Sequence, residues 1–308
     1  MRGLTPSFLC MKKSLVTGGA GFIGSHVVDK LLELGHQVIV IDNESSDGHN
    51  NYYWNDQCQN HKVDITDFQS IASLFVGVDY VYHLAAKASV QASVDNPSPT
   101  INTQVVGTLN VLEASRIAGV EKVIYSSTSA CYGNENPIPN VETMREDPLN
   151  PYAIGKLCGE QLVRAYHYLY GLKTVSFRYT NVYGERARHV GTYAPVISKF
   201  LKARRKQESL SIFGDGEQRR DFIHVDDVVN ANVSISHMEL DQWGETFNIG
   251  YGKNFSVNEI ANLISDDQIF LDGRPGEMRE TLADITKAKQ NLNWRPKVDV
   301  LEWIQSQL

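Results

Sequence analysis

The chain has 308 residues, of which 42% are hydrophobic and 21% are charged, and its formal net charge is −7. This length is enough to bury a substantial core in one large domain or two joined domains. The negative charge, without a long run of one sign, argues against a nucleic-acid partner or an anionic membrane surface. No apolar stretch reaches the ~20 residues of a membrane span, so we expect no membrane segment.

The four cysteines are scattered, with no C-x-x-C pair and no histidine cluster at metal spacing. We therefore expect free thiols, a reducing cytoplasmic environment and no metal site. The stretch before Met11 is too short and too weakly apolar for a secretory signal. Residues 1–11 are expected to be an N-terminal extension ahead of the first strand.

A glycine-rich turn separates the first apolar run from the first helical pattern, with the spacing G-x-x-G-x-x-G. Such glycines allow a sharp turn, a close approach of the backbone to a pyrophosphate, and close helix–strand packing. The helix that follows offers free N–H groups at its N-terminus. The turn therefore predicts a dinucleotide site formed by Gly18, Gly21, Phe22, Ile23 and Gly24.

The second expected strand, residues 37–41, ends in Asp42, which lies 18 residues after Gly24. A carboxylate at about this distance accepts hydrogen bonds from a ribose and repels a 2′-phosphate. The sequence thus favours NAD over NADP. The polar residues 43–60 are expected to form a loop over the cofactor.

Further strands are expected at residues 62–65, 80–83, 122–126 and 174–178, with long helices at about 99–118 and 151–170. Apolar strands that alternate with helices predict an α/β fold, a Rossmann-type doubly wound parallel sheet. His83 is expected to pack at a strand end. We expect an NAD-binding domain over residues 12–180 with a return segment at about 221–250. A smaller, interleaved C-terminal substrate domain would comprise residues 181–220 and 251–308.

Tyr152 and Lys156 form a Tyr-x-x-x-Lys pair on an expected helix. Residues at i and i+4 share one helix face, so the ammonium is expected near the phenol. A nearby cation, helped by the positive charge of the nicotinamide, favours the phenolate and moves the tyrosine pKa towards neutral. Tyr152 is therefore a candidate general base, one β–α unit after a hydroxyl-rich strand end at residues 126–128.

The motif TGGAGFIGSH resembles the extended short-chain dehydrogenase/reductases. The stretches RYTNVYG, GDGEQRRDFIHVDDVV and RPGEMRETLADITKAKQNLNW extend the resemblance to nucleotide-sugar epimerases of the UDP-glucose/UDP-N-acetylglucosamine 4-epimerase type. Matching SSTSACYG to the family pattern implies that the Thr128 hydroxyl bonds the reacting oxygen. Ser127 and Ser129 leave a one-residue ambiguity.

The resemblance also implies the roles of other residues. Asp64 and Ile65 would meet the adenine, Asn181 the substrate, and Arg220 and Arg274 its diphosphate, while Arg219 would be solvated. The remaining cofactor residues implied are Asn43, Leu84, Ala85, Ala86, Lys87 and Ser126, and the substrate residues implied are Lys87, Thr128, Asn181, Arg188, Arg220, Arg274 and Thr281.

The expected reaction is epimerisation at C4 of a UDP-hexose through a transient 4-keto sugar. Thr281, seven residues after Arg274, occupies a position where a small residue in the family admits an N-acetyl group. Arg188 aligns with a carboxylate-binding arginine of UDP-glucuronate 4-epimerases, which keeps glucuronate as an alternative. Ser129 and Ala130 stand where nucleotide-sugar dehydratases carry an Asp-Glu pair, and the glutamate that UDP-glucuronate decarboxylases usually carry in the same loop is missing. These two absences favour simple epimerisation.

Other NAD-dependent dehydratases, decarboxylases or reductases remain alternatives within enzymes. A non-catalytic NAD-binding regulator is the alternative of another class, although such proteins typically lose the Tyr-x-x-x-Lys pair. The resemblance further implies a homodimer formed through the two long helices.

Overall fold

Seven parallel strands form the central sheet, in the order β10-β6-β5-β4-β1-β2-β3. The computed structural model describes residues 11–46, 51–188, 195–273 and 278–308. The strands are β1 (Lys13–Thr17), β2 (Gln37–Asp42), β3 (Gln59–Lys62), β4 (Tyr80–His83), β5 (Lys122–Thr128), β6 (Lys173–Tyr179) and β10 (Glu245–Ile249). This sheet confirms the expected Rossmann-type fold.

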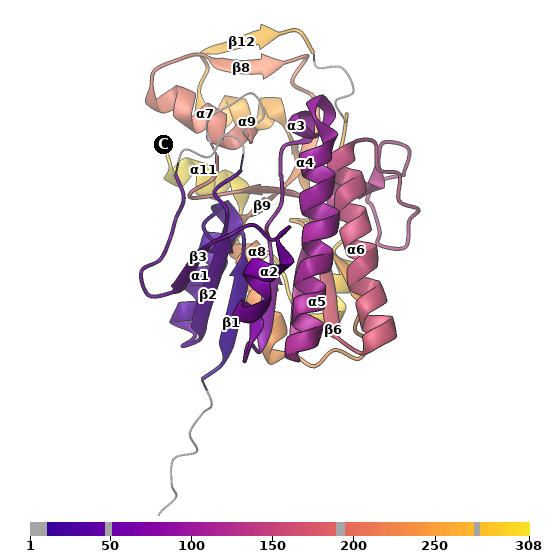
Figure 1. Ribbon diagram of the computed structural model, residues 1–308. Helices are drawn as coiled ribbons and strands as arrows, with labels where there is room; N and C mark the ends of the chain where they lie inside the picture. The colour runs from indigo at the N-terminus through magenta and orange to yellow at the C-terminus, as the bar shows by residue number, and fades with distance from the viewer. Residues whose placement is uncertain (1–10, 47–50, 189–194, 274–277) are drawn as a thin grey trace, which may run out of the picture.

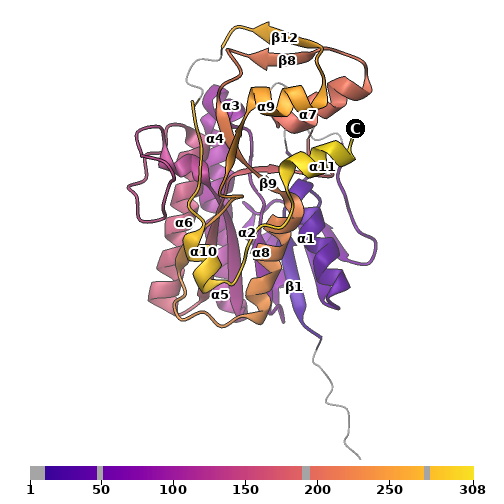
Figure 2. The same cartoon turned by 180° about the vertical axis from the view of Figure 1, so that it is seen from behind.

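Helices cover both faces of the sheet (Figures 1 and 2). On β1, Leu15 packs into the core beneath one face and Val16 into the core beneath the other. Because successive side chains of a strand point to opposite faces, a strand buried on both sides is continuously apolar. The helices are α1 (Phe22–Glu33), α8 (Val225–Ser234) and α10 (Thr286–Asn291) on one face, and α2 (Phe68–Ile71), α5 (Thr108–Ala118) and α6 (Pro151–Tyr170) on the other.

Two expected elements differ from the structure. The third strand is β3 at 59–62 rather than 62–65, and its sequence QNHK is polar. It pairs only with β2 at the edge of the sheet, where polar side chains reach solvent, so no apolar pattern marks it.

The helix expected over 99–118 is interrupted. It consists of α4 (Pro97–Ile101), a π-helical turn at Asn102–Gly107, and α5, which ends as expected at the left-handed Gly119. A π turn adds one residue to the helical repeat, and apolar periodicity does not reveal it. Gly107 faces Ile65 so closely that a Cβ would lie 2.6 Å from its Cδ1.

A second body lies above the carboxyl ends of the sheet (Figure 1). It has its own apolar core, and the chain passes between the two bodies near residues 180, 225 and 250 and again before and after α10. Its strands are β7 (Asn181–Tyr183), β9 (Arg219–His224) and β11 (Asn254–Ser256) in one sheet, and β8 (Leu210–Phe213) and β12 (Gln268–Leu271) in another. Its helices are α7 (Val196–Arg205), α9 (Val257–Ile264) and α11 (Val300–Ser306), whereas α3 (Val90–Asp95) packs against α4 and α6. None of the helices in the described ranges has the length and apolar character needed to cross a membrane.

Candidate active site

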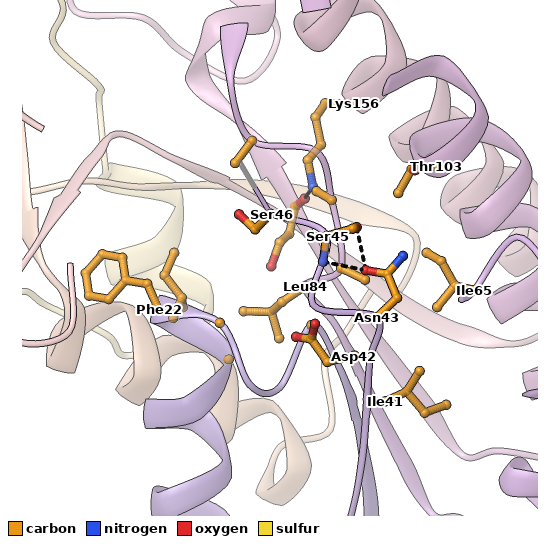
Figure 3. Close-up of a pocket in the computed structure, with 18 of the residues that line it drawn as sticks. Phe22, Ile41, Asp42, Asn43, Ser45, Ser46, Ile65, Leu84, Thr103 and Lys156 are labelled. Atoms are coloured by element: carbon orange, nitrogen blue, oxygen red, sulfur yellow. Dashed lines mark hydrogen bonds between the residues drawn. The ribbon is translucent and has the colours of Figure 1, made fainter. Parts of the chain in front are cut away.

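A cavity opens at the carboxyl ends of β1, β2, β4 and β5 (Figure 3). In a parallel sheet this edge, outside the strand ends, is where ligands bind. The predicted residues that line it are Gly18, Gly21, Phe22, Ile23, Gly24, Asp42, Asn43, Ile65, Leu84, Ala85, Ala86, Ser126, Tyr152 and Lys156. These residues come from six separate segments of the chain.

The glycine turn forms a cradle that side chains would fill. Gly18 has φ of 68°, and a Cβ on it would lie 2.7 Å from the backbone nitrogen of Ala85. A Cβ on Gly24 would lie 2.1 Å from the Gly18 carbonyl oxygen. Gly21 is the N-cap of α1, and no side chain of the described residues caps that helix. The cradle and the uncapped N–H groups fit the diphosphate of a dinucleotide.

Asp42 stands at the end of β2, beside the cradle. Its Oδ2 accepts a hydrogen bond from the Ala20 N–H (3.2 Å) and its Oδ1 from the Glu44 N–H (2.8 Å). Burial raises the pKa of this carboxyl. Its position on the cavity wall fits the ribose contact that favours NAD.

Two predicted cofactor residues lie behind the wall instead of on it. Asp64 accepts a hydrogen bond from Nδ2 of Asn43 (2.6 Å), and the Asn43 Oδ1 in turn accepts from the N–H and hydroxyl of Ser45 (Figure 3). Lys87 donates to the carbonyl of Ser45. Both residues therefore hold the loop that follows β2.

Helix α6 places the tyrosine and the lysine. Asn150 caps the helix by accepting a hydrogen bond from the Ala153 N–H (3.0 Å), and Pro151 occupies its first position. Lys156 donates from Nζ to the Ser126 carbonyl (2.6 Å), and Tyr125 donates from its hydroxyl to the Lys156 carbonyl (3.1 Å). These bonds fasten α6 to β5 at the cavity floor.

Burial dominates the ionisation of this pair. Burial raises the pKa of Tyr152, and hydrogen bonding to the Thr128 hydroxyl opposes that rise. Burial lowers the pKa of Lys156 to about 7. Because the Lys156 Nζ is directed at the Ser126 carbonyl, protein groups alone do not move the Tyr152 pKa towards neutral. Thr128 does not line the cavity, but its hydroxyl hydrogen-bonds the Tyr152 phenol.

We expect Lys156→Met to stabilise the fold at pH 7 while abolishing turnover. The folded-state pKa of Lys156 lies below its ordinary value of 10.5. The unfolded chain therefore binds more protons between pH 7 and 10.5, and wild-type stability rises with pH across that window. Methionine removes this dependence.

The measurement is urea unfolding of both proteins, stripped of NAD, at pH 7 and pH 9.5. The expected gain in unfolding free energy for the variant is on the order of 2 kcal/mol at pH 7 and smaller at pH 9.5. An equal difference between the two proteins at both pH values would contradict the lowered pKa.

His83 is a packed residue, as expected. It is buried, its Nδ1 lies 2.7 Å from the Thr17 hydroxyl, and its Nε2 lies 3.0 Å from the Thr108 hydroxyl. Burial lowers its pKa to about 3, so it remains neutral. Within the described ranges, no group of His, Cys, Asp and Glu side chains could hold a metal ion.

A second cavity lies in the upper body and contains two of the predicted substrate residues, Asn181 and Arg220. Thr281 adjoins it, since its hydroxyl accepts hydrogen bonds from Nδ2 of Asn181 (3.4 Å) and from the Asp221 N–H (3.3 Å). Arg188 is described but does not line either cavity, and Arg274 lies outside the described residues.

Arg219 is not the solvated residue that was expected. Its Nε donates to Oδ1 of Asn254 (3.0 Å), and its Nη2 pairs with Glu259 (3.0 Å). These contacts fasten β9 to β11 and α9. Successive residues of a strand point to opposite faces of the sheet. Arg220, next to Arg219, is therefore the one that reaches the cavity.

Several lining residues were not predicted. Thr103 reaches the first cavity from the π turn, for which the sequence has no simple signal. Tyr52 lies in the loop expected over the cofactor, but that expectation did not single it out. Other unpredicted lining residues include Ile41, Ser45, Ser46, Val63, Ala88 and Tyr179 in the first cavity, and Val196, Lys199, Phe200 and Phe222 in the second.

Comparison with known proteins agrees with this geometry. The model of the NAD dependent epimerase/dehydratase family matches residues 14–250. The chain is 40% identical over 299 residues to a putative UDP-glucose 4-epimerase of Methanocaldococcus jannaschii, covering 94% of this chain and 95% of that one.

Two solved structures are similar over nearly their whole length. One is a UDP-glucose 4-epimerase of Thermotoga maritima with UDP-glucose, with 40% identity, a TM-score of 0.88, and coverage of 95% and 96% of the two chains. The other is a UDP-N-acetylglucosamine 4-epimerase of Methanobrevibacter ruminantium M1 in complex with UDP-N-acetylmuramic acid. Its identity is 36% and its TM-score 0.89, with coverage of 96% and 97%.

Proposed function

The chain belongs to the NAD-dependent epimerase/dehydratase family, and from that premise we propose that it interconverts UDP-hexoses that differ at C4. The observation that carries this proposal is the combination of three features, of which the first two line one cavity at the sheet edge and the third lies in the upper body. These are the glycine cradle with Asp42, the Tyr152–Lys156 pair, and an adjoining cavity with Asn181 and Arg220. The first holds NAD, the second moves a proton, and the third receives the nucleotide part of the substrate.

In the proposed mechanism, Tyr152 removes the proton of the sugar C4 hydroxyl through its phenol oxygen. NAD supplies the hydride acceptor that makes this oxidation possible and the hydride that reverses it. The Thr128 hydroxyl holds the reacting oxygen, and Lys156 holds the nicotinamide ribose. After the 4-keto sugar turns its other face to the site, Tyr152 returns the proton, and C4 is inverted without net oxidation.

The second cavity supports recognition of a diphosphate. Arginine pairs with phosphate oxygens through two parallel N–H groups, which suits Arg220 to this task. We assign the same task to Arg274 from the family resemblance. Asn181 is held beside Thr281 and the Asp221 carbonyl, from which it would contact the sugar nucleotide.

We also propose a homodimer built from α5 and α6, which lie side by side (Figure 1). Apolar side chains of both helices are exposed there, a pattern typical of a covered interface. They include Leu109, Ile117, Ile154 and Leu169.

We expect Thr281→Tyr to abolish use of N-acetylated substrates. Threonine is small, and its hydroxyl lies against Asn181, which we assign to contact with the sugar nucleotide. A tyrosine would fill the space needed by an N-acetyl group. The expected result is at least a 100-fold loss of kcat/KM for UDP-N-acetylglucosamine, about 3 kcal/mol of transition-state binding, with less than a tenfold loss for UDP-glucose.

Steady-state assays with both sugars check this prediction. Thr286→Tyr, at an α10 position away from both cavities, serves as a control for the added bulk. Equal losses for the two sugars in Thr281→Tyr would remove Thr281 from the role of a size gate.

The proposed function is tested by incubating the protein separately with UDP-glucose, UDP-N-acetylglucosamine and UDP-glucuronate, without added NAD. Proton NMR then identifies the products. A C4-inverted hexose supports the proposal, whereas turnover of UDP-glucuronate alone would favour the alternative based on Arg188. Loss of water or CO₂ would indicate a dehydratase or decarboxylase, and no turnover of any sugar would favour an NAD-binding regulator.

A further inference from the structure

The turn after β7 connects the second cavity to the coenzyme side of the molecule. Tyr183, the last residue of β7, lines the second cavity. Three residues later, Arg186 pairs through Nη2 with Oδ2 of Asp29 on α1 (2.7 Å). Its guanidinium carbon also lies 5.2 Å from the ring centroid of Tyr53. One side chain thus touches both a helix and a loop of the coenzyme-binding part.

Asp29 is shared by two segments that are far apart in the sequence. Its Oδ2 pairs with Arg186, while its Oδ1 accepts a hydrogen bond from Nδ2 of Asn55 (2.9 Å). Asn55 and Tyr53 belong to the loop at 51–58, and the Tyr53 N–H donates to the Ala20 carbonyl of the glycine turn (2.8 Å). This loop contributes Tyr52 to the wall of the coenzyme cavity. Asp29 therefore joins that loop to the turn after β7.

Glu185 anchors the same turn on its other side. Its carboxylate accepts a hydrogen bond from Nε1 of Trp303 on α11 (3.2 Å) and lies 3.4 Å from Nε2 of His224. Its backbone carbonyl lies 3.0 Å from Nε2 of His26 on α1. The turn is thus bonded to both bodies of the protein.

The backbone of Arg186 indicates that this position is held by its surroundings. Its φ is 60°, a left-handed conformation that residues other than glycine rarely adopt. Such a conformation persists when neighbouring contacts fix it, and it is often associated with a binding role. Here the fixing contacts are those of Arg186 and Glu185.

We propose that residues 184–188 form a clasp that retains NAD, with Arg186 as its positioning residue. Through Asp29 and Tyr53, Arg186 holds the loop at 51–58 closed against the coenzyme cavity. Because Tyr183 and Arg186 lie on one short segment, occupation of the second cavity by the UDP part of the substrate tightens the clasp. This second element rests on the proposed function, whereas the first requires only that the protein binds NAD.

The test measures the rate at which bound NAD leaves the enzyme after dilution into an excess of isotopically labelled NAD. We expect Arg186→Ala and Asp29→Asn each to raise this rate about tenfold, from the loss of a partly buried ion pair and a cation–π contact. The double variant should be no faster than the faster single variant, because both changes break one connection. Arg186→Lys should recover part of the retention, which distinguishes a lost contact from misfolding.

Lys30→Ala is the matched control, since Lys30 follows Asp29 on α1 and pairs only with Glu33 among the described contacts. It should release NAD at the wild-type rate. Equal rates of NAD release from Arg186→Ala and Lys30→Ala would overturn the clasp. A rate increase in the Arg186→Ala/Asp29→Asn double variant equal to the product of the two single increases would overturn it too.

Uridine diphosphate is the probe that tests whether occupation of the second cavity affects NAD retention by the clasp. It should slow NAD release from the wild-type enzyme and leave Arg186→Ala unaffected. Equal slowing in both proteins would overturn the coupling between the cavities but leave the clasp itself. Because release is measured without turnover, a failure of the epimerase proposal would show separately in the sugar assays.

Discussion

Tyr152→Phe is expected to lower kcat by at least 1,000-fold, while NAD and UDP-sugar remain bound. The phenol lies on the cavity wall with Lys156 and Ser126, and it is the group assigned to proton transfer at C4. A positioned acid–base group contributes roughly 10²–10⁴ in rate. Phenylalanine keeps the ring and removes only the proton-transferring oxygen. The change should therefore appear in kcat and leave KM within about threefold.

Tyr166→Phe is the matched control on the same helix. The Tyr166 hydroxyl donates to Glu113 (3.0 Å) and lies outside both cavities. This variant should retain kcat within about twofold, because the hydroxyl that it removes lies away from both cavities. Comparable losses in the two variants would show that a tyrosine hydroxyl on α6 matters for folding and not for proton transfer.

Arg178→Met is expected to destabilise the protein by about 3–5 kcal/mol, because it leaves the Glu160 carboxylate buried without its cation. Arg178 and Glu160 are both nearly inaccessible to solvent, at 1% and 4% exposure. Two bonds join them, from Nη2 to Oε1 (2.6 Å) and from Nε to Oε2 (3.1 Å). The hydroxyls of Ser127 (2.7 Å) and Thr246 (3.2 Å) also donate hydrogen bonds to the Glu160 carboxylate.

This ion pair matters for the candidate site because Glu160 lies one turn beyond Lys156 on α6, and Ser127 lines the first cavity. Denaturant unfolding compares Arg178→Met with Lys287→Ala, which removes the half-exposed Lys287–Glu245 pair at the sheet edge. The control should cost about 1 kcal/mol or less. The double variant Arg178→Met/Glu160→Leu should regain part of the loss, since it removes both charges. A loss below 1 kcal/mol in Arg178→Met would contradict the buried-pair account.

The parts of the site that the sequence predicted well depend on local geometry. The glycine turn, Asp42 at a strand end, and the i, i+4 pair of Tyr152 and Lys156 each follow from spacing within one or two elements. A strand–turn–helix unit fixes where such residues point. The parallel sheet then brings the separate units to one edge.

The parts that the sequence did not predict depend on contacts between distant segments. The polar edge strand β3 has no apolar pattern, and the π turn that carries Thr103 arises where Gly107 packs against Ile65. The lowered Lys156 pKa reflects burial in the assembled fold rather than its helical spacing. Arg219 likewise gained partners from β11 and α9, which no local rule supplies.

In the proposed reaction, the hydride that leaves C4 comes back to the opposite face of the same carbon. The most direct measurement is turnover of UDP-glucose or UDP-N-acetylglucosamine deuterated at C4, in ordinary water and without added NAD. We expect the C4 epimer to retain its deuterium at C4. Replacement of that deuterium by solvent hydrogen in the product would contradict it.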